Sequence, residues 1–161
     1  MLKVLVGYPS PTEEFVIVDR MTQAIDTINT VITTDQLAEL QSEADQVYVD
    51  PALKHYAVSL VTATRNPAAA GQDKLAKYMS YGASPRASIN MVLAGRALAF
   101  LRGRTYALPE DVRDVAADVL RHRIVLSYEA LADAVSPDDL ITALMAAVPL
   151  PEVALQEPAS E

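Results

Sequence analysis

The chain has 161 residues, of which 51% are hydrophobic and 21% charged, and its formal net charge is −8. This composition suits a folded domain and excludes a chain that is disordered throughout. The absence of cysteine and the presence of only two histidines exclude a disulfide framework, a thiol nucleophile and a multi-histidine metal site. No apolar run approaches the ~20 residues of a membrane helix, and the first residues lack the long apolar core of a secretory signal. We therefore expect a cytoplasmic protein without membrane insertion.

Charge is unevenly distributed along the chain. Residues 1–75 carry a net charge of −5, residues 76–123 carry +4, and residues 124–161 carry −7. The overall acidity argues against a nucleic-acid partner, since proteins that bind the phosphate backbone are usually basic. Acidic side chains within segment 109–123 argue against a DNA-binding helix there, despite the positive block around it. Seven of the eight cations in the middle block are arginines: Arg86, Arg96, Arg102, Arg104, Arg113, Arg121 and Arg123.

The chain opens with LKVLV at residues 2–6, an aliphatic and β-branched run that predicts a short buried strand before the turn GYPSP. A single strand cannot satisfy its own backbone hydrogen-bonding groups. Either it pairs with a short segment such as residues 47–49, or its sheet lies outside this chain.

Six later segments predict helices, because each opens with a capping residue or an early proline and continues with apolar residues at helical spacing. They start near residues 10, 34, 50, 84, 108 and 136; Ile25 is an apolar position of the first, and Gly103 closes the fourth. Residues 66–72 predict a loop. The predicted fold is mainly α, a bundle of about five or six helices with at most a minor short-strand element.

No segment forms a self-sufficient active site. The five glycines fall into neither the phosphate loop that ends in Gly-Lys-Ser/Thr nor the dinucleotide fingerprint, and there is no nucleophile elbow or HExxH zinc motif. Asp138 and Asp139 form a carboxylate pair, but at a helix start they are most simply explained as complements of the helix dipole. His55 and His122 are solitary, which favours structural roles.

Arg86 is the exception among the residues near helix starts. Ser84 as the N-cap and Pro85 as the first helical residue place Arg86 in the first turn, where a cation opposes the helix dipole by ~0.3–1 kcal/mol. The starts near residues 10, 34, 108 and 136 carry acidic residues instead. An anion docked there would meet both free backbone N–H groups and a guanidinium, and a phosphate is the natural guest. The alternative is an arginine that simply points into solvent.

The remaining arginines and two tyrosines allow structural explanations as well. Arg96, Arg102 and Arg104 could line a subunit interface or solvate a helix face, whereas Arg121 and Arg123 complement a helix C-terminus. The rings of Tyr78 and Tyr81 could stack on an adenine or pack in the core.

Four runs resemble the C-terminal part of MoxR-type AAA+ ATPases over about residues 1–151. They are MLKVLVGYPSPTEE, DPALKHYAVSLVTATR, YGASPRASINMVLAGRALAFLRGRTYALPEDV and VLRHRIVLSYEA. The resemblance implies that residues 1–9 are the last strand and linker of a nucleotide-binding core that is missing here. Residues 10–148 would be the helical lid domain, and residues 149–161 a disordered acidic tail.

The resemblance also implies roles for individual residues. Arg86 falls on the family's sensor-2 arginine, which would act catalytically on the terminal phosphates of a nucleotide in the intact oligomer, its own subunit's or a neighbour's. Ser84 and Tyr81 would be further nucleotide contacts, and no metal ligand is expected. ATP and Mg²⁺ would bind the intact parent. No cofactor is expected to be bound to this chain alone, and this chain alone would not hydrolyse ATP.

For the intact protein, the resemblance implies a homo-oligomeric ring, a hexamer, with chaperone-like remodelling or maturation of client proteins. A protein with a von Willebrand A-type domain would be one partner. A free-standing helical interaction module that has lost the ATPase core is the alternative. The aliphatic opening segment argues against it, because an unpaired apolar strand favours aggregation.

Overall fold

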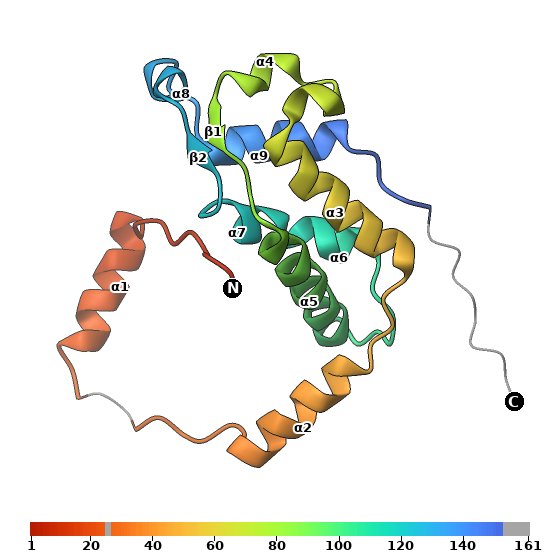
Figure 1. Ribbon diagram of the computed structural model, residues 1–161. Helices are drawn as coiled ribbons and strands as arrows, with labels where there is room; N and C mark the ends of the chain where they lie inside the picture. The colour runs from red at the N-terminus through yellow and green to blue at the C-terminus, as the bar shows by residue number, and fades with distance from the viewer. Residues whose placement is uncertain (25–26, 153–161) are drawn as a thin grey trace, which may run out of the picture.

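The structure, a computed structural model, describes residues 1–24 and 27–152. It has two parts that differ in burial, and Figure 1 shows α1 of the first part standing away from the second. We define the arm as residues 1–46 and the bundle as residues 47–152. Ile25 and residues 153–161 of the predicted tail lie outside the described residues.

The elements follow one another mostly as helices. The arm holds α1 (Pro11–Met21) and α2 (Thr34–Asp45), and the bundle holds α3 (Pro51–Arg65), the 3-10 helix η1 (Pro67–Ala70), α4 (Asp73–Ala76), β1 (Met79–Tyr81), α5 (Pro85–Leu101), α6 (Pro109–Asp114), α7 (Ala116–Leu120), β2 (Val125–Leu126), α8 (Tyr128–Ala132) and α9 (Pro137–Ala147). The mainly helical class is therefore confirmed. Among the described helices, none has both the length and the apolar character that crossing a membrane requires.

The six predicted helix starts are all found, and the short elements are the additions. The segment predicted as one helix from residue 108 is divided at Val115 into α6 and α7. The segment predicted as a loop contains η1, and α4 and α8 are one-turn helices that periodicity does not reveal. Elements this short bury too few side chains to leave a pattern in the sequence.

The core of the bundle lies where α3 and α5 pack against each other and against α6, α7 and α9. On α3 the buried positions repeat at helical spacing, from Leu53 through Ala57 and Leu60 to Thr64. On α5 a Cβ at Gly95 would lie 3.1 Å from a methyl carbon of Val112. The absence of a side chain there lets α5 and α6 approach closely.

The C-terminus of α5 ends at Gly103, as the sequence predicts. Gly103 has φ +72°, and its N–H donates to the carbonyl of Phe100 at 2.8 Å. The next N–H, of Arg104, reaches back to the carbonyl of Ala99 at 3.0 Å. These two bonds form a Schellman motif, which stops the helix and turns the chain toward α6.

The small sheet was not placed by the sequence. Strands β1 and β2 pair antiparallel, with Met79 opposite Leu126 and Tyr81 opposite Val125. The predicted short strand at residues 47–49 appears only as a single parallel bridge between Tyr48 and Tyr106. Both features join residues that are more than 40 positions apart, so only the folded chain reveals them.

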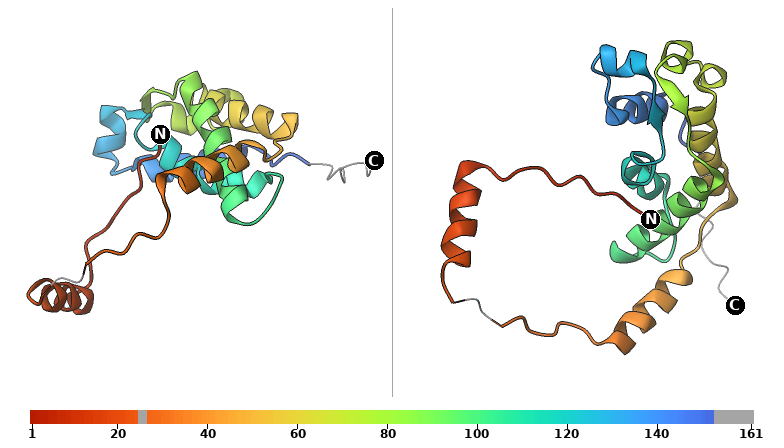
Figure 2. Two further views of the ribbon diagram at one scale, coloured as in Figure 1. Left: turned by 90° about the horizontal axis from the view of Figure 1, so that it is seen from below. Right: turned by 60° about the vertical axis from the view of Figure 1, so that its left-hand side comes forward.

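The arm differs from the bundle because almost none of its surface is covered. Helix α1 has no buried residue, and Figure 2 shows it standing away from the bundle, although the N-terminal segment itself lies against α7. Residues 2–6 form no strand, and pairing with residues 47–49 is wrong as a prediction. Within the described residues, no strand pairs with residues 2–6.

Candidate functional site

The turn that leads into α5 is fixed by a close approach to the end of α3. A Cβ at Gly82 would lie 2.3 Å from the backbone carbonyl oxygen of Thr64, so only glycine fits there. The buried Thr64 hydroxyl accepts a hydrogen bond from the N–H of Ala83 at 2.9 Å and donates to the carbonyl of Val61 at 2.6 Å. The turn therefore has a defined position on the bundle.

The same turn presents its polar residues to solvent. Ala83 and Ala87 are fully buried, whereas Ser84, Pro85 and Arg86 between them are exposed. The two alanines hold the turn against the core, and the three residues between them form an outward-facing start of α5.

The N-terminus of α5 is left open by its own side chains. Ser84 is the N-cap residue, but its hydroxyl accepts no capping hydrogen bond, and the first turn contains no acidic residue. By contrast, side chains cap the backbone N–H groups of α1, α2, α3, α8 and α9. The free N–H groups of a 17-residue helix are thus available to an anion.

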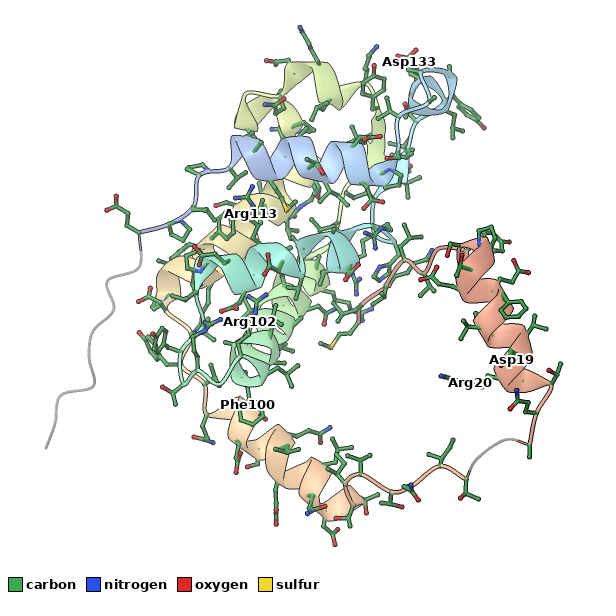
Figure 3. The ribbon with its side chains drawn as sticks, turned by 180° about the vertical axis from the view of Figure 1, so that it is seen from behind. Asp19, Arg20, Phe100, Arg102, Arg113 and Asp133 are labelled. Carbon is green, nitrogen blue, oxygen red and sulfur yellow. The ribbon has the colours of Figure 1, made fainter. Side chains whose placement is uncertain are left out.

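Arg86 is one of two arginines in the positive block that make no hydrogen bond or ion pair within residues 1–24 and 27–152; the other is Arg113, on α6 (Figure 3). Arg96 pairs with Asp45 of α2, and Arg123 donates to backbone carbonyls. The positive charge of Arg86 is therefore uncompensated at a helix end that already attracts anions.

Arg102 and Arg104 hold a buried carboxylate instead of solvating a helix face. Arg104 donates to both oxygens of Asp111, at 2.7 and 2.6 Å, and Arg102 donates at 2.8 Å. Asp111 is 0% exposed. Burial raises its pKa, but hydrogen bonds from Arg104, the Leu108 N–H and Arg102 outweigh burial and lower the pKa overall. The cluster joins the end of α5 to the start of α6.

The two carboxylates at the start of α9 have different partners. Asp139 completes a capping box with Ser136, as a helix-start acid should. Asp138 instead pairs with Arg121, which lies just beyond the end of α7. The sequence interpretation of both carboxylates as structural is consistent with these contacts, although the partner of Asp138 was not foreseen.

The two tyrosines beside the turn have different environments. Tyr78 is half-buried and donates its hydroxyl to Asp133 at 2.8 Å. Tyr81 is 73% exposed at the end of β1, so core packing is wrong for this residue. Tyr81, Ser84 and Arg86 thus all lie exposed within one short stretch, where the sequence analysis placed the candidate site. Thr64, which anchors that stretch, was missed because a threonine in the last turn of a helix gives no signal.

No group of three or more histidine, aspartate or glutamate side chains in the described part of the chain is arranged to hold a metal ion. The residues present fit the phosphate end of a nucleotide: open N–H groups, a guanidinium and a hydroxyl. The metal would need protein groups that this stretch does not supply.

Comparison with known proteins identifies the class first. Residues 72–144 match the family described as AAA lid domain. This range contains the turn, α5 and the Asp111 cluster. The helical bundle is consistent with an AAA lid.

Individual relatives then identify the family. Chaperone MoxR1 of Mycobacterium tuberculosis is 44% identical over 153 residues, covering 95% of this chain and 41% of that protein. Protein MoxR of Paracoccus denitrificans is 44% identical over 110 residues, covering 65% of this chain and 32% of that protein. A crystal structure from Cytophaga hutchinsonii, described as a candidate ATPase, superposes with a TM-score of 0.87 at 34% identity, covering 94% of this chain and 47% of that chain.

The chain matches the C-terminal part of a MoxR-type AAA+ ATPase. It spans less than half the length of each of these three relatives.

Proposed function

We propose that this chain is the nucleotide-sensing lid of a MoxR-type ATPase and that Arg86 contacts the terminal phosphates of ATP. One observation carries the proposal: an exposed arginine without a partner among the described residues lies at a helix N-terminus that no side chain caps. The turn lies within residues 72–144, which match the AAA lid domain family, and in this proposal it faces a nucleotide that is held mainly by the core.

The energetics favour a phosphate at this position. A first-turn cation costs ~0.3–1 kcal/mol through the helix dipole, whereas each charge-assisted hydrogen bond to an anion contributes about 1.5–3 kcal/mol. Arg86 would offer its guanidinium fork, and Ser84 a hydroxyl. The exposed ring of Tyr81 would offer a stacking face.

Bound ATP, with Mg²⁺, supplies the phosphoryl group that is transferred to water. The role of Arg86 would be to neutralise the charge that the transferred group carries, which is how cations accelerate phosphoryl transfer. Because Thr64 and Gly82 fix the turn, the guanidinium would be presented by a rigid support. This chain alone would not hydrolyse ATP, since the phosphate-loop residues would come from the core.

The uncovered arm supports a partner core. Leu5, Val6 and Phe15 are 71, 86 and 72% exposed, and such a concentration of apolar surface is typical of an interface. We propose that the preceding core of the same protein covers it. We further propose a cytoplasmic homo-oligomer, a hexameric ring, that remodels client proteins, with a von Willebrand A-type protein as partner.

The test is Arg86→Ala in the full-length protein. We expect ATP turnover to fall at least about tenfold, since a well-placed arginine can accelerate phosphoryl transfer by up to about 10³–10⁵-fold. The melting temperature should stay within about 2 °C, because an exposed side chain contributes little stability. Arg113→Ala is the matched control, an exposed arginine of the same block, and should leave turnover unchanged. A folded Arg86→Ala protein with normal turnover would refute the sensor role.

A free-standing interaction module is the second candidate function. The bundle favours it in one respect, because its buried core is complete without any nucleotide. The coding sequence upstream of residue 1 separates the two. An in-frame phosphate loop supports the lid of an ATPase, whereas a stop codon with its own ribosome-binding site supports the module.

A further inference from the structure

The N-terminal segment is held to the bundle mainly through the backbone of Lys3. The backbone N–H of Lys3 donates to the carbonyl of Asp118 at 2.8 Å, and the carbonyl of Lys3 accepts from Arg121 Nη1 at 2.8 Å. A longer contact of 3.4 Å joins Arg123 to the carbonyl of Met1. In the described part of the chain, these are the hydrogen bonds that connect residues 1–9 to the bundle. The side chains around them are exposed, including Val4 at 65%, so this attachment depends on the backbone of Lys3.

Arg121 is fixed before it reaches Lys3. Its side chain is only 15% exposed, and its Nε and Nη2 donate to the Asp138 carboxylate at 2.8–3.0 Å. Nη1 donates to Asp118 at 2.7 Å and also to the carbonyl of Lys3. Because the fork on Asp138 sets the plane of the guanidinium, Nη1 has little freedom of direction. An ion pair between Arg121 and Asp138 that only joined α7 to α9 would not need the hydrogen bond from Arg121 to Lys3.

The arm is thereby attached at two places. Arg121 holds its beginning, and the exposed pair of Asp45 with Arg96 holds its end. Between them α1 buries no residue, and Figure 2 shows it standing away from the bundle. The direction in which residues 2–6 leave the bundle is therefore set by the Lys3 attachment.

We propose that Arg121 is a positioning residue that fixes residues 1–5 on the lid and so sets the orientation of the lid relative to the nucleotide-binding core. The second half rests on the proposed function, in which these residues continue into the core. The contact of Arg86 with a phosphate then depends on Arg121, because a misplacement of ~1 Å can reduce a rate by about 10²-fold.

The first test measures the attachment itself, without reference to ATP. The chain has no cysteine, so spin labels at Leu5→Cys and Lys54→Cys report one distance, between the segment and α3. We expect Arg121→Gln to broaden the distance distribution at least about twofold, since the segment would lose its anchor. Arg113→Gln is the control and should leave the distribution unchanged. An unchanged distribution in folded Arg121→Gln protein would overturn the proposal.

A second variant tests the proposal if Arg121→Gln does not fold. Asp138→Asn weakens the fork that orients Arg121 Nη1 toward the carbonyl of Lys3 and leaves the bond from the Lys3 N–H to Asp118 in place. It should broaden the same distribution, and a distribution as narrow as that of the unmodified chain would overturn the proposal.

The full-length protein tests the consequence. We expect Arg121→Gln to lower kcat for ATP about tenfold, and broadening without a change in kcat would refute control of lid orientation. If Arg86→Ala leaves turnover unchanged, the proposed function fails, whereas the distance measurement still decides the attachment.

Discussion

Helices α1 and α9 begin with the same sequence signals but differ in how much they bury in the structure. Each has 11 residues, an N-cap serine, a proline in the first turn and a complete capping box. Helix α9 buries Leu140, Ile141 and Leu144, whereas α1 buries nothing. Local sequence therefore decides that a helix forms, and the presence of a packing partner decides what it stabilises.

The same contrast holds between the arm and the bundle as wholes. Phe15 and Met21 in the arm are 72 and 60% exposed, whereas Leu53 and Met91 in the bundle are fully buried. A helix of this length is marginal alone in water. The arm thus presents uncovered apolar side chains, whereas the bundle encloses a core of its own.

The largest effect should come from matched truncations of apolar side chains. We expect Leu144→Ala in α9 to lower the free energy of unfolding by about 4 kcal/mol, through lost burial and the cavity that remains. Phe15→Ala in α1 should change it by less than about 0.5 kcal/mol, because the ring is already in water. Urea unfolding of both variants measures the difference. A large loss for Phe15→Ala would show that α1 packs within this chain.

The next largest difference between the arm and the bundle should come from neutralising one carboxylate in each and comparing the loss in the free energy of unfolding. Asp111→Asn in the bundle should lose about 3 kcal/mol, because Arg102 and Arg104 lose a buried partner but can partly rehydrate. Asp45→Asn removes the exposed carboxylate that pairs with Arg96 and should cost below about 1 kcal/mol. Equal costs in urea unfolding would contradict the assignment of Asp111 as the main ionic contact.

Acid should reduce the effect of Asp111→Asn on the free energy of unfolding. The folded pKa of Asp111 lies below its unfolded value, so its contribution is complete above the unfolded pKa of ~3.9. It is lost as the pH falls from there through the folded pKa. Unfolding curves at pH 7 and pH 2.5 should show the difference between the two proteins shrinking, and a constant difference would argue against a charged Asp111.

The smallest effect should come from removing the N-cap hydroxyl of the capping box in α9 and in α1. Ser136→Ala removes the N-cap hydroxyl of α9 and should cost about 1 kcal/mol in cooperative unfolding. Ser10→Ala removes the same cap from α1 and should lower helical circular dichroism slightly without moving the unfolding midpoint. A shift of the midpoint in Ser10→Ala would mean that α1 unfolds together with the bundle.

The sequence determined the features that depend on neighbouring residues. Capping serines and early prolines predicted the starts of α1, α5 and α9, and Gly103 predicted the end of α5, because these signals act within one helical turn. The unusual position of Arg86 was also visible, since the helix dipole makes a first-turn cation conspicuous.

Only the tertiary structure decided which of those residues have partners. It paired Arg102 and Arg104 with Asp111, placed Arg121 between Asp138 and Lys3, joined β1 to β2, and left Tyr81 exposed. The physical reason is the same in each case. Ion pairs, strand pairing and burial depend on groups that folding brings together from distant positions, and a single sequence contains no record of those distances.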